Sequence, residues 1–386
     1  MKIVIAPDSF KGSLSAPQLC AHIRKGVLRA CPSASVLEIP LADGGEGTME
    51  NIVHATNGTI TDVVVRGPLG EPTKAAYGVL GDGQTVVIEM AQASGLPLLK
   101  EHEKNPLLAT SYGTGELIRH ALDAGYRRFI IGLGGSATND GGAGMLRALG
   151  LRFLDSAGRP LAEGGAALAE LACIDDAAWD QRISEASFLI ASDVTNPLCG
   201  PSGASAVFGP QKGATPEMVA RLDRALARFA EVVERQTGKA IRDVPGSGAA
   251  GGMGAALLAF MGAEMRPGID LLLETVQFEQ RIRDADLIIT GEGRLDSQTL
   301  AGKVIAGVCR RAGQFAIPTV ALCGGMELSA EQCDQLGLVA GFSLVPGPCT
   351  LEQAKEHAGV WSEERAEQLM RLVVSLTGAS KRRGSD

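Results

Sequence analysis

Acidic, basic and hydroxyl side chains gather directly after short apolar runs of this sequence. The runs end at Ala6, Pro40, Thr290 and Leu322, and the side chains that follow the first three are Asp8, Ser9, Lys11, Asp43, Glu46, Glu292, Arg294 and Asp296. If the runs are parallel strands, their carboxyl ends share one edge, where open α/β sheets bind ligands. So many carboxylates repel one another, but they suit a divalent cation and a phosphorylated ligand. The alternative is that the acids cap helices and face water.

A second set of residues lies in a glycine-rich segment near the middle of the chain. Gly132 to Ala137 matches the dinucleotide-binding pattern G-x-G-x-x-A, and Asp155 stands about where the ribose-binding acid would fall. Taken alone, this match predicts an NAD-binding protein. The segment continues through Thr138 to Gly144, however, and its Asn-Asp-Gly-Gly sequence would break the required helix. A wide loop that offers several N–H groups to phosphates fits better. The Walker A pattern is absent, so a phosphate chain would need a cradle of this other kind.

Asp193 directly follows another apolar run, in the segment Ser192 to Pro197. An Asp at the end of a strand, followed by Asn-Pro, is typical of a turn. The same carboxylate could bind a metal ion or accept the proton of a hydroxyl group. The spacing leaves these roles open.

Composition and charge argue against several classes of protein. The 386 residues include 36 Lys and Arg against 44 Asp and Glu, a net charge of −8, and no basic patch indicates nucleic-acid binding. The 8 cysteines form no C-x-x-C pair, which argues against a zinc ribbon and fits free thiols in a reducing cytosol. The apolar run at the N-terminus is too short for a signal peptide, and no run approaches the ~20 residues of a membrane helix. We therefore expect a cytoplasmic protein.

Alternating strand and helix patterns at both ends of the chain predict a doubly wound parallel sheet. Its expected strands are Lys2–Ala6, Ser35–Ile39, Asp286–Thr290, Pro318–Leu322 and Val339–Val345. Between them, residues 61–66, 73–79 and 85–90 are separated by glycine turns and predict an antiparallel meander. We expect a discontinuous outer domain of residues 1–62 and 275–386, with a second α/β domain of mixed sheet, residues 63–274, inserted between its second and third strands.

A series of short segments carries a family resemblance over essentially the whole chain. The segments are Ala6–Ser13, Asp43–Thr48, Gly113–Glu116, Gly132–Gly144, Ser192–Pro197, Val207–Ala214, Gly246–Gly254 and Thr290–Asp296. In this order they resemble the bacterial glycerate kinase family, type 1. The resemblance implies transfer of the γ-phosphate of ATP to D-glycerate with Mg²⁺, giving 2-phosphoglycerate or, in some members, 3-phosphoglycerate. It also implies a flavodoxin-like domain with an inserted α/β domain, a site in the cleft between them, and a place in glyoxylate or sugar-acid catabolism.

From the residues and the resemblance together we expect specific roles at the site. The catalytic residues would be Lys11, Asp43, Asp193 and Asp296, with Mg²⁺ held by Asp193 and Asp296 and one acid acting as the base. Lys11 and Arg294 would neutralise the γ-phosphoryl group or hold the glycerate carboxylate. The residues expected to contact glycerate or the nucleotide are Asp8, Ser9, Gly44, Gly45, Glu46, Gly134, Gly135, Ser136, Thr138, Asn139, Asp140, Asn196, Glu292 and Arg294.

Two other functions and two oligomeric states stay open at this point. An NAD-dependent oxidoreductase of a small hydroxy acid would rest on Gly132 to Ala137 and Asp155. A non-catalytic protein that binds a sugar acid would bind its ligand without forming ADP. Phosphorylation at O2 or at O3, and a monomer or a homodimer, are equally compatible with the sequence.

Overall fold

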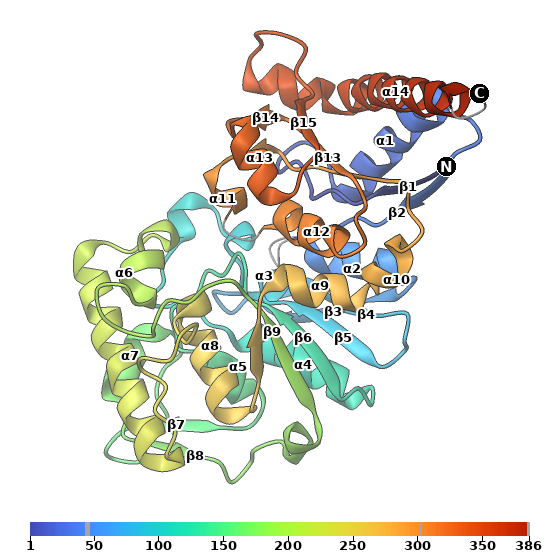
Figure 1. Cartoon of the computed structure of the whole chain (residues 1–386). Coiled ribbons are helices and arrows are strands. Elements are labelled where there is room, and N and C mark those ends of the chain that lie inside the picture. Colours follow the sequence, from blue (N-terminus) through green and yellow to red (C-terminus); the bar gives the residue numbers. More distant parts are fainter. Residues whose placement is uncertain (43–46, 301–302, 384–386) are drawn as a thin grey trace. The chain divides into compact units, whose positions relative to one another are not determined.

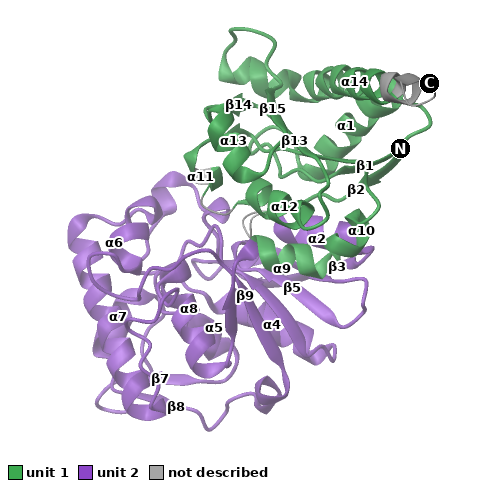
Figure 2. Cartoon of the chain, in the orientation of Figure 1, with its two compact units in different colours: residues 1–43, 269–386 green, residues 44–268 purple. Residues whose placement is uncertain are grey.

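A computed structural model of the chain describes residues 1–42, 47–300 and 303–383 (Figure 1). The chain divides into two compact units (Figure 2). Unit 1 consists of Met1–Asp43 and Ile269–Asp386, and unit 2 of Gly44–Gly268. Among the described residues, no helix has both the length and the apolar character required to cross a membrane.

Unit 1 is built on a parallel sheet, which has five strands in its described part. In spatial order these are β15 (Ala340–Ser343), β13 (Thr319–Cys323), β11 (Leu287–Thr290), β1 (Lys2–Ile5) and β2 (Ser35–Glu38). Ile3 of β1 is in register with Leu287 on one side and Val36 on the other. The order is the 2-1-3-4-5 arrangement of flavodoxin-like folds, so the predicted doubly wound α/β architecture is confirmed.

Two helices of unit 1, α1 (Ala16–Ala30) and α14 (Leu351–Arg383), pack closely on each other. α1 begins with a capping box between Ser15 and Gln18. A Cβ atom on Gly26 of α1 would lie 2.1 Å from the carbonyl oxygen of Glu363, so this close approach requires glycine. The other helices are α9 (Gly268–Thr275), α10 (Phe278–Ile282), α11 (Ser297–Leu300), α12 (Val304–Gly313) and α13 (Ala330–Leu336), and a small sheet pairs β12 (Arg294–Leu295) with β14 (Gly325–Met326).

Unit 2 contains a mixed sheet, with six strands among the described residues. Their spatial order is β10 (Glu264–Arg266), β9 (Ser187–Ala191), β6 (Arg128–Gly132), β5 (Thr85–Glu89), β4 (Pro72–Val79) and β3 (Thr59–Arg66). β3, β4 and β5 pair antiparallel, which confirms the predicted meander, while β5, β6, β9 and β10 run parallel. The carboxyl ends of β5, β6 and β9 therefore lie at one edge.

An apolar core joins this sheet to the helices of unit 2. Phe129 of β6 stacks on Phe188 of β9 with ring centroids 4.8 Å apart, and α4 packs against β3, β4 and β5. The helices are α2 (Thr48–Thr56), α3 (Ala91–Ser94), α4 (Tyr112–Asp123), α5 (Ala143–Ala148), α6 (Ala204–Phe208), α7 (Pro216–Thr237) and α8 (Ala249–Phe260). Shorter 3₁₀ segments are Leu96–Leu98, Glu101–Glu103, Gly165–Glu170, Gln181–Glu185 and Pro210–Lys212, and β7 (Arg152–Leu154) pairs with β8 (Cys173–Asp175).

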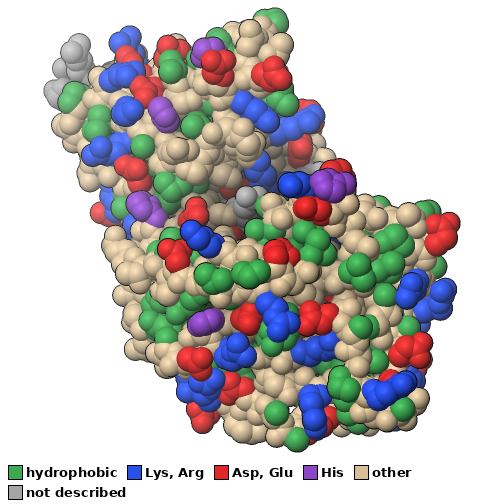
Figure 3. Space-filling view, turned by 180° about the vertical axis from the view of Figure 1, so that it is seen from behind, with side chains coloured by type: hydrophobic (Ala, Val, Ile, Leu, Met, Phe, Trp, Pro, Cys, Tyr) green, Lys and Arg blue, Asp and Glu red, His purple; other side chains and the backbone are tan. Residues whose placement is uncertain are grey.

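The surface is mixed in charge. On the face shown in Figure 3, Lys and Arg side chains alternate with Asp and Glu and do not merge into one basic area. That distribution agrees with the net charge of −8 and gives a nucleic acid no continuous basic footprint on this face.

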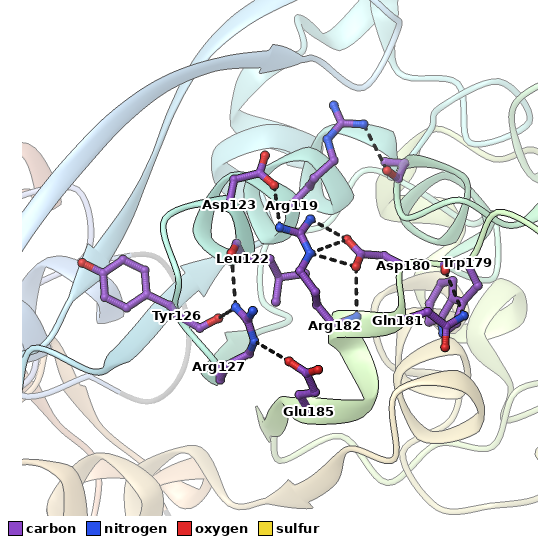
Figure 4. A network of polar contacts seen from close by, with 11 residues as sticks. Arg119, Leu122, Asp123, Tyr126, Arg127, Trp179, Asp180, Gln181, Arg182 and Glu185 are labelled. Atoms are coloured by element: carbon purple, nitrogen blue, oxygen red, sulfur yellow. Dashed lines mark hydrogen bonds and ion pairs between the residues drawn. The ribbon is translucent and has the colours of Figure 1, made fainter.

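An arginine network ties the segment before β9 to the end of α4 (Figure 4). Arg182 donates hydrogen bonds to both carboxylate oxygens of Asp180, the shortest at 2.7 Å, and another of 2.7 Å to Asp123. The hydrogen bonds from Arg182 hold the pKa of Asp180 below its ordinary value, although partial burial opposes them. A neighbouring arginine, Arg127, donates to the carbonyl oxygens of Leu122 and Tyr126.

We expect Arg182→Met to destabilise unit 2 by about 1–2 kcal/mol, because charge-assisted hydrogen bonds to two carboxylates are lost. Urea unfolding monitored by the fluorescence of Trp179, in a Trp361→Phe background, measures the change. The matched control is Arg159→Met, since Arg159 is an exposed side chain that pairs with Asp155 on a surface turn. Equal unfolding midpoints for the two variants would show that the arginine network does not contribute to the stability of unit 2.

Candidate functional site

The carboxyl edge of the unit 1 sheet holds the first group of predicted site residues. Asp8 follows β1 and is 6% exposed, and its N–H donates to the carbonyl of Gly291, which follows β11, at 2.8 Å. Its carboxylate accepts the N–H of Ser9 at 2.6 Å. Glu292 is also buried and accepts a short hydrogen bond from the Thr299 hydroxyl. The loops after β1 and β11 thus meet at this edge, as predicted.

The basic residues at this edge differ from the buried acids in exposure. Lys11 is exposed on the loop after β1. Arg294, in β12, forms an ion pair with Glu327, and its Nε lies 3.9 Å from a carboxylate oxygen of Asp296. The N–H of Asp296 donates to Thr299 at 3.2 Å, which fixes the backbone of this loop. The predicted residues Asp43, Gly44, Gly45 and Glu46 lie outside the described residues.

The second group lies at the carboxyl edge of the unit 2 sheet, in the loop between β6 and α5. This loop pairs with the segment after β5, since Leu96 N–H donates to Gly135 O at 2.8 Å and Ala137 N–H to Ser94 O at 2.9 Å. Ser136 is 7% exposed, while Thr138 and Asn139 are fully buried. Within the described ranges, the N–H groups of Gly134, Gly135, Thr138 and Asn139 donate to no protein acceptor. The loop therefore has the unpaired donors that an anion needs.

Asp140 shapes this loop from within. Its buried carboxylate accepts four hydrogen bonds, from Ser111 N–H at 2.9 Å, Ser111 Oγ at 2.8 Å, Gly142 N–H at 3.1 Å and Gly144 N–H at 3.1 Å. Gly142 has φ +74°, which a side chain would strain. These contacts make Asp140 a support for the loop, and its direct contact with a ligand stays a prediction.

A buried lysine lies directly beneath the loop. Lys212, in the 3₁₀ segment Pro210–Lys212, is 2% exposed, and its Nζ donates to Ser136 Oγ at 2.8 Å and to Thr138 O at 2.7 Å. Burial lowers the pKa of Lys212 to about 7, and the negative charge of Asp140 acts in the opposite direction. An ammonium group has three N–H donors, so Lys212 can hold the loop in place and still donate to an anion.

Two further loops belong to this part of unit 2, one after β9 and one after Gly246. The carboxyl edge also carries Asp193 and Asn196 after β9. Asn196 Nδ2 donates to Ser202 O at 2.8 Å, and the backbone carbonyl of Asn196 accepts Gly248 N–H at 3.0 Å. Asp193 is exposed and accepts Gly268 N–H at 3.2 Å. The loop after Gly246 thereby joins the segment after β9.

Three successive residues in that loop, Ala250, Gly251 and Gly252, have left-handed backbone angles at the start of α8. A Cβ atom on Gly251 would lie 2.1 Å from the carbonyl oxygen of Thr138, so the two loops touch backbone to backbone. Ala250 adopts φ 53° although it has a side chain, which indicates local strain held by the packing around it.

Polar side-chain atoms without partners occur in both of these loops. Asn139 Nδ2 donates to Ser205 Oγ at 2.9 Å. Within the described part of the chain, however, Thr138 Oγ1, Asn139 Oδ1 and Ser247 Oγ are buried without any hydrogen-bond partner. Buried polar atoms are almost always paired, so an unpaired group of them indicates a place for water or a ligand.

The two carboxylates predicted to bind Mg²⁺ are Asp193 and Asp296. Among the described residues, no three His, Cys, Asp or Glu side chains are close enough to form a metal site by themselves. Mg²⁺ is usually held by one or two carboxylates together with substrate phosphates, so binding Mg²⁺ does not require a cluster of three such side chains. Asp193 follows β9 in unit 2 and Asp296 follows β12 in unit 1, and their binding of Mg²⁺ stays a prediction.

The comparisons with known proteins agree in one assignment. The model of the glycerate kinase family matches residues 3–374. This chain belongs to the glycerate kinase family. A glycerate kinase of Bacillus subtilis (strain 168) is 51% identical over 369 residues, which cover 96% of this chain and 97% of the relative. The glycerate 2-kinase of Escherichia coli K12 is 48% identical over 92% of this chain and 93% of the relative. A crystal structure from Salmonella typhimurium LT2 that carries the name glycerate kinase 2 matches with a TM-score of 0.89 at 50% identity, covering 99% of both chains.

The family assignment confirms the resemblance found in the sequence, and the NAD-dependent alternative gains no support. α5 begins only at Ala143, after a long loop, whereas a dinucleotide-binding helix would begin directly after Ala137. Asp155 accepts the N–H groups of Ala157 and Arg159 at 2.9 Å each and forms a surface turn.

Sequence reasoning missed Lys212, Ser205 and Ser247 as candidate site residues of this glycerate kinase family member. All three are buried; Lys212 and Ser205 form hydrogen bonds with the loop at Ser136 to Asn139, and Ser247 lies in the loop whose Gly251 touches Thr138. Two of these residues could have been proposed from the sequence, because Lys212 and Ser247 lie in the glycine-containing segments Val207–Ala214 and Gly246–Gly254 of the family pattern. A lysine flanked by such residues is usually exposed, so its burial is visible only in the fold.

Glu89 is a further buried acid at the edge of unit 2, at the end of β5. It is 4% exposed and accepts Met49 N–H at 2.7 Å, at the start of α2. Burial raises the pKa of Glu89 to about 6, although the N–H groups of Met49 and Gly47 oppose this effect. Glu89 thus fixes the beginning of α2, which follows the predicted Asp43 to Gly47 segment.

The raised pKa of Glu89 predicts how stability depends on pH. The folded protein holds the proton more tightly than the unfolded chain, so the contribution of Glu89 is fully present below pH 4.5 and is lost as pH rises to about 6. Relative to Glu89→Gln, wild type should therefore lose about 1–2 kcal/mol over this interval. Urea unfolding at pH 4.5, 5.5 and 7 measures the difference. Glu71→Gln, which changes an exposed glutamate of the same unit, should show no such trend.

Proposed function

We propose that this protein phosphorylates D-glycerate with ATP and Mg²⁺ in the cytoplasm, giving ADP and 2-phosphoglycerate. Family membership over residues 3–374 carries the proposal. The name glycerate 2-kinase of the relative that is 48% identical favours phosphorylation at O2 over O3. A role in glyoxylate or sugar-acid catabolism would follow from this reaction.

The loop at Gly134 to Asn139 is suited to the phosphate chain. Its unpaired N–H groups and the third donor of Lys212 would stabilise the charge that develops on the transferred phosphoryl group. A bound anion would raise the pKa of Lys212 above about 7 and keep the amine protonated. Thr138 Oγ1, which is buried without a partner, supplies a further hydrogen-bonding group in this loop.

The reaction needs an oriented acceptor and a group that takes its proton. A glycerate hydroxyl oxygen attacks the γ-phosphorus as the bond to the β,γ-bridging oxygen breaks, and ADP leaves with that electron pair. Either Asp193 or Asp296 would accept the hydroxyl proton, and Lys11 or Arg294 would hold the glycerate carboxylate. Mg²⁺, held by the carboxylates, would neutralise phosphate charge.

An ADP-release assay over a panel of hydroxy acids, with and without Mg²⁺, tests the proposal. We expect Mg²⁺-dependent ADP formation with D-glycerate, and ³¹P NMR should show the phosphate on O2. Oxidation of NADH by hydroxypyruvate, or ligand binding without ADP formation, would contradict it. A phosphate on O3 would overturn only the position of transfer.

A further inference from the structure

A pocket of about 410 Å³ opens at the carboxyl edge of the unit 1 sheet. Residues that follow β1, β11, β13 and β15 line it, and so does one face of α14 from Leu351 to Trp361. β1 and β11 are the neighbouring strands at which the strand order of this sheet reverses. Open α/β sheets bind ligands at this point, and the volume lies in the range of small-molecule sites.

The inner wall of this pocket is apolar and partly aromatic. Phe10, Leu344 and Ala358 line it and are 5%, 2% and 4% exposed, respectively. Trp361 is half-buried beside them, and Leu351 at the start of α14 is 71% exposed. A flat heteroaromatic ring would bury apolar area against these side chains and could stack on an aromatic face. Glycerate, which is small and polar throughout, would leave its hydroxyl groups unpaired against such a wall.

Basic side chains line the same pocket. Lys11, Lys355 and Arg294 all contribute to it, against one acid, Glu327, which pairs with Arg294. Ser13 Oγ donates to Lys355 O at 2.7 Å, so the turn after β1 is fastened to α14 and the wall is formed in advance. Two lysines beside an apolar wall match a ligand with an aromatic ring at one end and a phosphate chain at the other.

We propose that this pocket binds the adenosine end of ATP, with the phosphates leaving it past Lys11 and Lys355. The inference rests on the proposed ATP dependence and adds to it the place of the nucleoside. It also assigns Trp361, Leu351 and Ala354 a role in nucleotide affinity, which their side-chain types alone do not suggest.

The two tryptophans of the chain make a direct test possible. In a Trp179→Phe background, titration with ADP should change the fluorescence of Trp361. Ala354→Leu fills the pocket from a helix position that tolerates Leu, and it should raise the Kd for ADP about tenfold or more. The KM for D-glycerate should change by less than about twofold. Ala330→Leu, at an exposed position of α13, is the matched control and should leave both constants unchanged.

A second variant keeps the test decisive if Ala354→Leu fails to fold. Leu351→Glu changes an exposed side chain at the mouth, and its negative charge should also weaken ADP binding. An unchanged Kd for ADP in the folded variants would overturn the inference. So would a raised KM for D-glycerate with ADP binding intact, which would assign the pocket to the acceptor acid. If wild type binds ADP at this pocket but forms no phosphoglycerate, the proposed function fails and the pocket assignment stands.

Discussion

Asp193→Asn and Asp296→Asn are each expected to lower kcat by about 10²–10⁴-fold, the range for loss of a catalytic acid–base group. In the proposed reaction these carboxylates bind Mg²⁺ or take the hydroxyl proton, and a neutral amide does neither well. The fold should be retained, because an asparagine is nearly the same size as an aspartate and its amide oxygen can still accept the N–H of Gly268 that the Asp193 carboxylate accepts.

Steady-state kinetics at saturating ATP and D-glycerate, with circular dichroism to check the fold, measures this effect. The matched controls are Asp62→Asn in unit 2 and Asp334→Asn in unit 1, both at exposed positions, and they should keep wild-type turnover. Near-wild-type kcat in both Asp193→Asn and Asp296→Asn would remove these two acids from the mechanism and leave Asp43 as the remaining candidate.

Lys212→Met should produce the second large loss, about 10²-fold in kcat, since small displacements of a positioning loop are that costly. The methionine fills the same space but donates no hydrogen bonds to Ser136 Oγ and Thr138 O. The loop then loses its support and a positive charge beside its unpaired N–H groups. Burial disfavours the charge of Lys212, so losing that charge offsets part of the cost of leaving Ser136 Oγ and Thr138 O without a donor, and the net loss of global stability should be small.

The comparison of kcat with thermal stability separates the two possible roles of Lys212. A purely structural lysine would lower the melting temperature and kcat together, whereas a lysine that serves the loop should lower kcat at nearly constant melting temperature. Lys239→Met, at an exposed lysine beyond α7, is the control. Unchanged kcat in Lys212→Met would show that the loop needs no cation beneath it.

The strand ends could be predicted from sequence because apolar runs and glycine turns are local signals. The strand expected at Lys2–Ala6 is observed at Lys2–Ile5, and the loops after Ile5 and Thr290 reach the same edge as expected. The interior of the unit 2 loops could not be predicted. The role of Asp140 depends on Ser111, which lies 29 residues earlier, and Lys212 meets Ser136 across 76 residues. Such pairings depend on tertiary packing, which no local pattern encodes.

Unit 1 cannot be completed until most of the chain has been synthesised. β1 lies between β2 and β11 in the sheet, so Ile3, Val4 and Ile5, which are fully buried in the final structure, must wait for Leu287–Thr290. Unit 2 is one continuous stretch, Gly44–Gly268, and emerges earlier. Domains generally fold as units in the order of their synthesis. Once unit 2 has folded, it connects the two sequence segments of unit 1 over a shorter distance than an unfolded chain of the same length would. We therefore expect unit 2 to be the first folded body on the ribosome, with the N-terminal strands exposed to chaperones and proteases until the third strand of their sheet arrives.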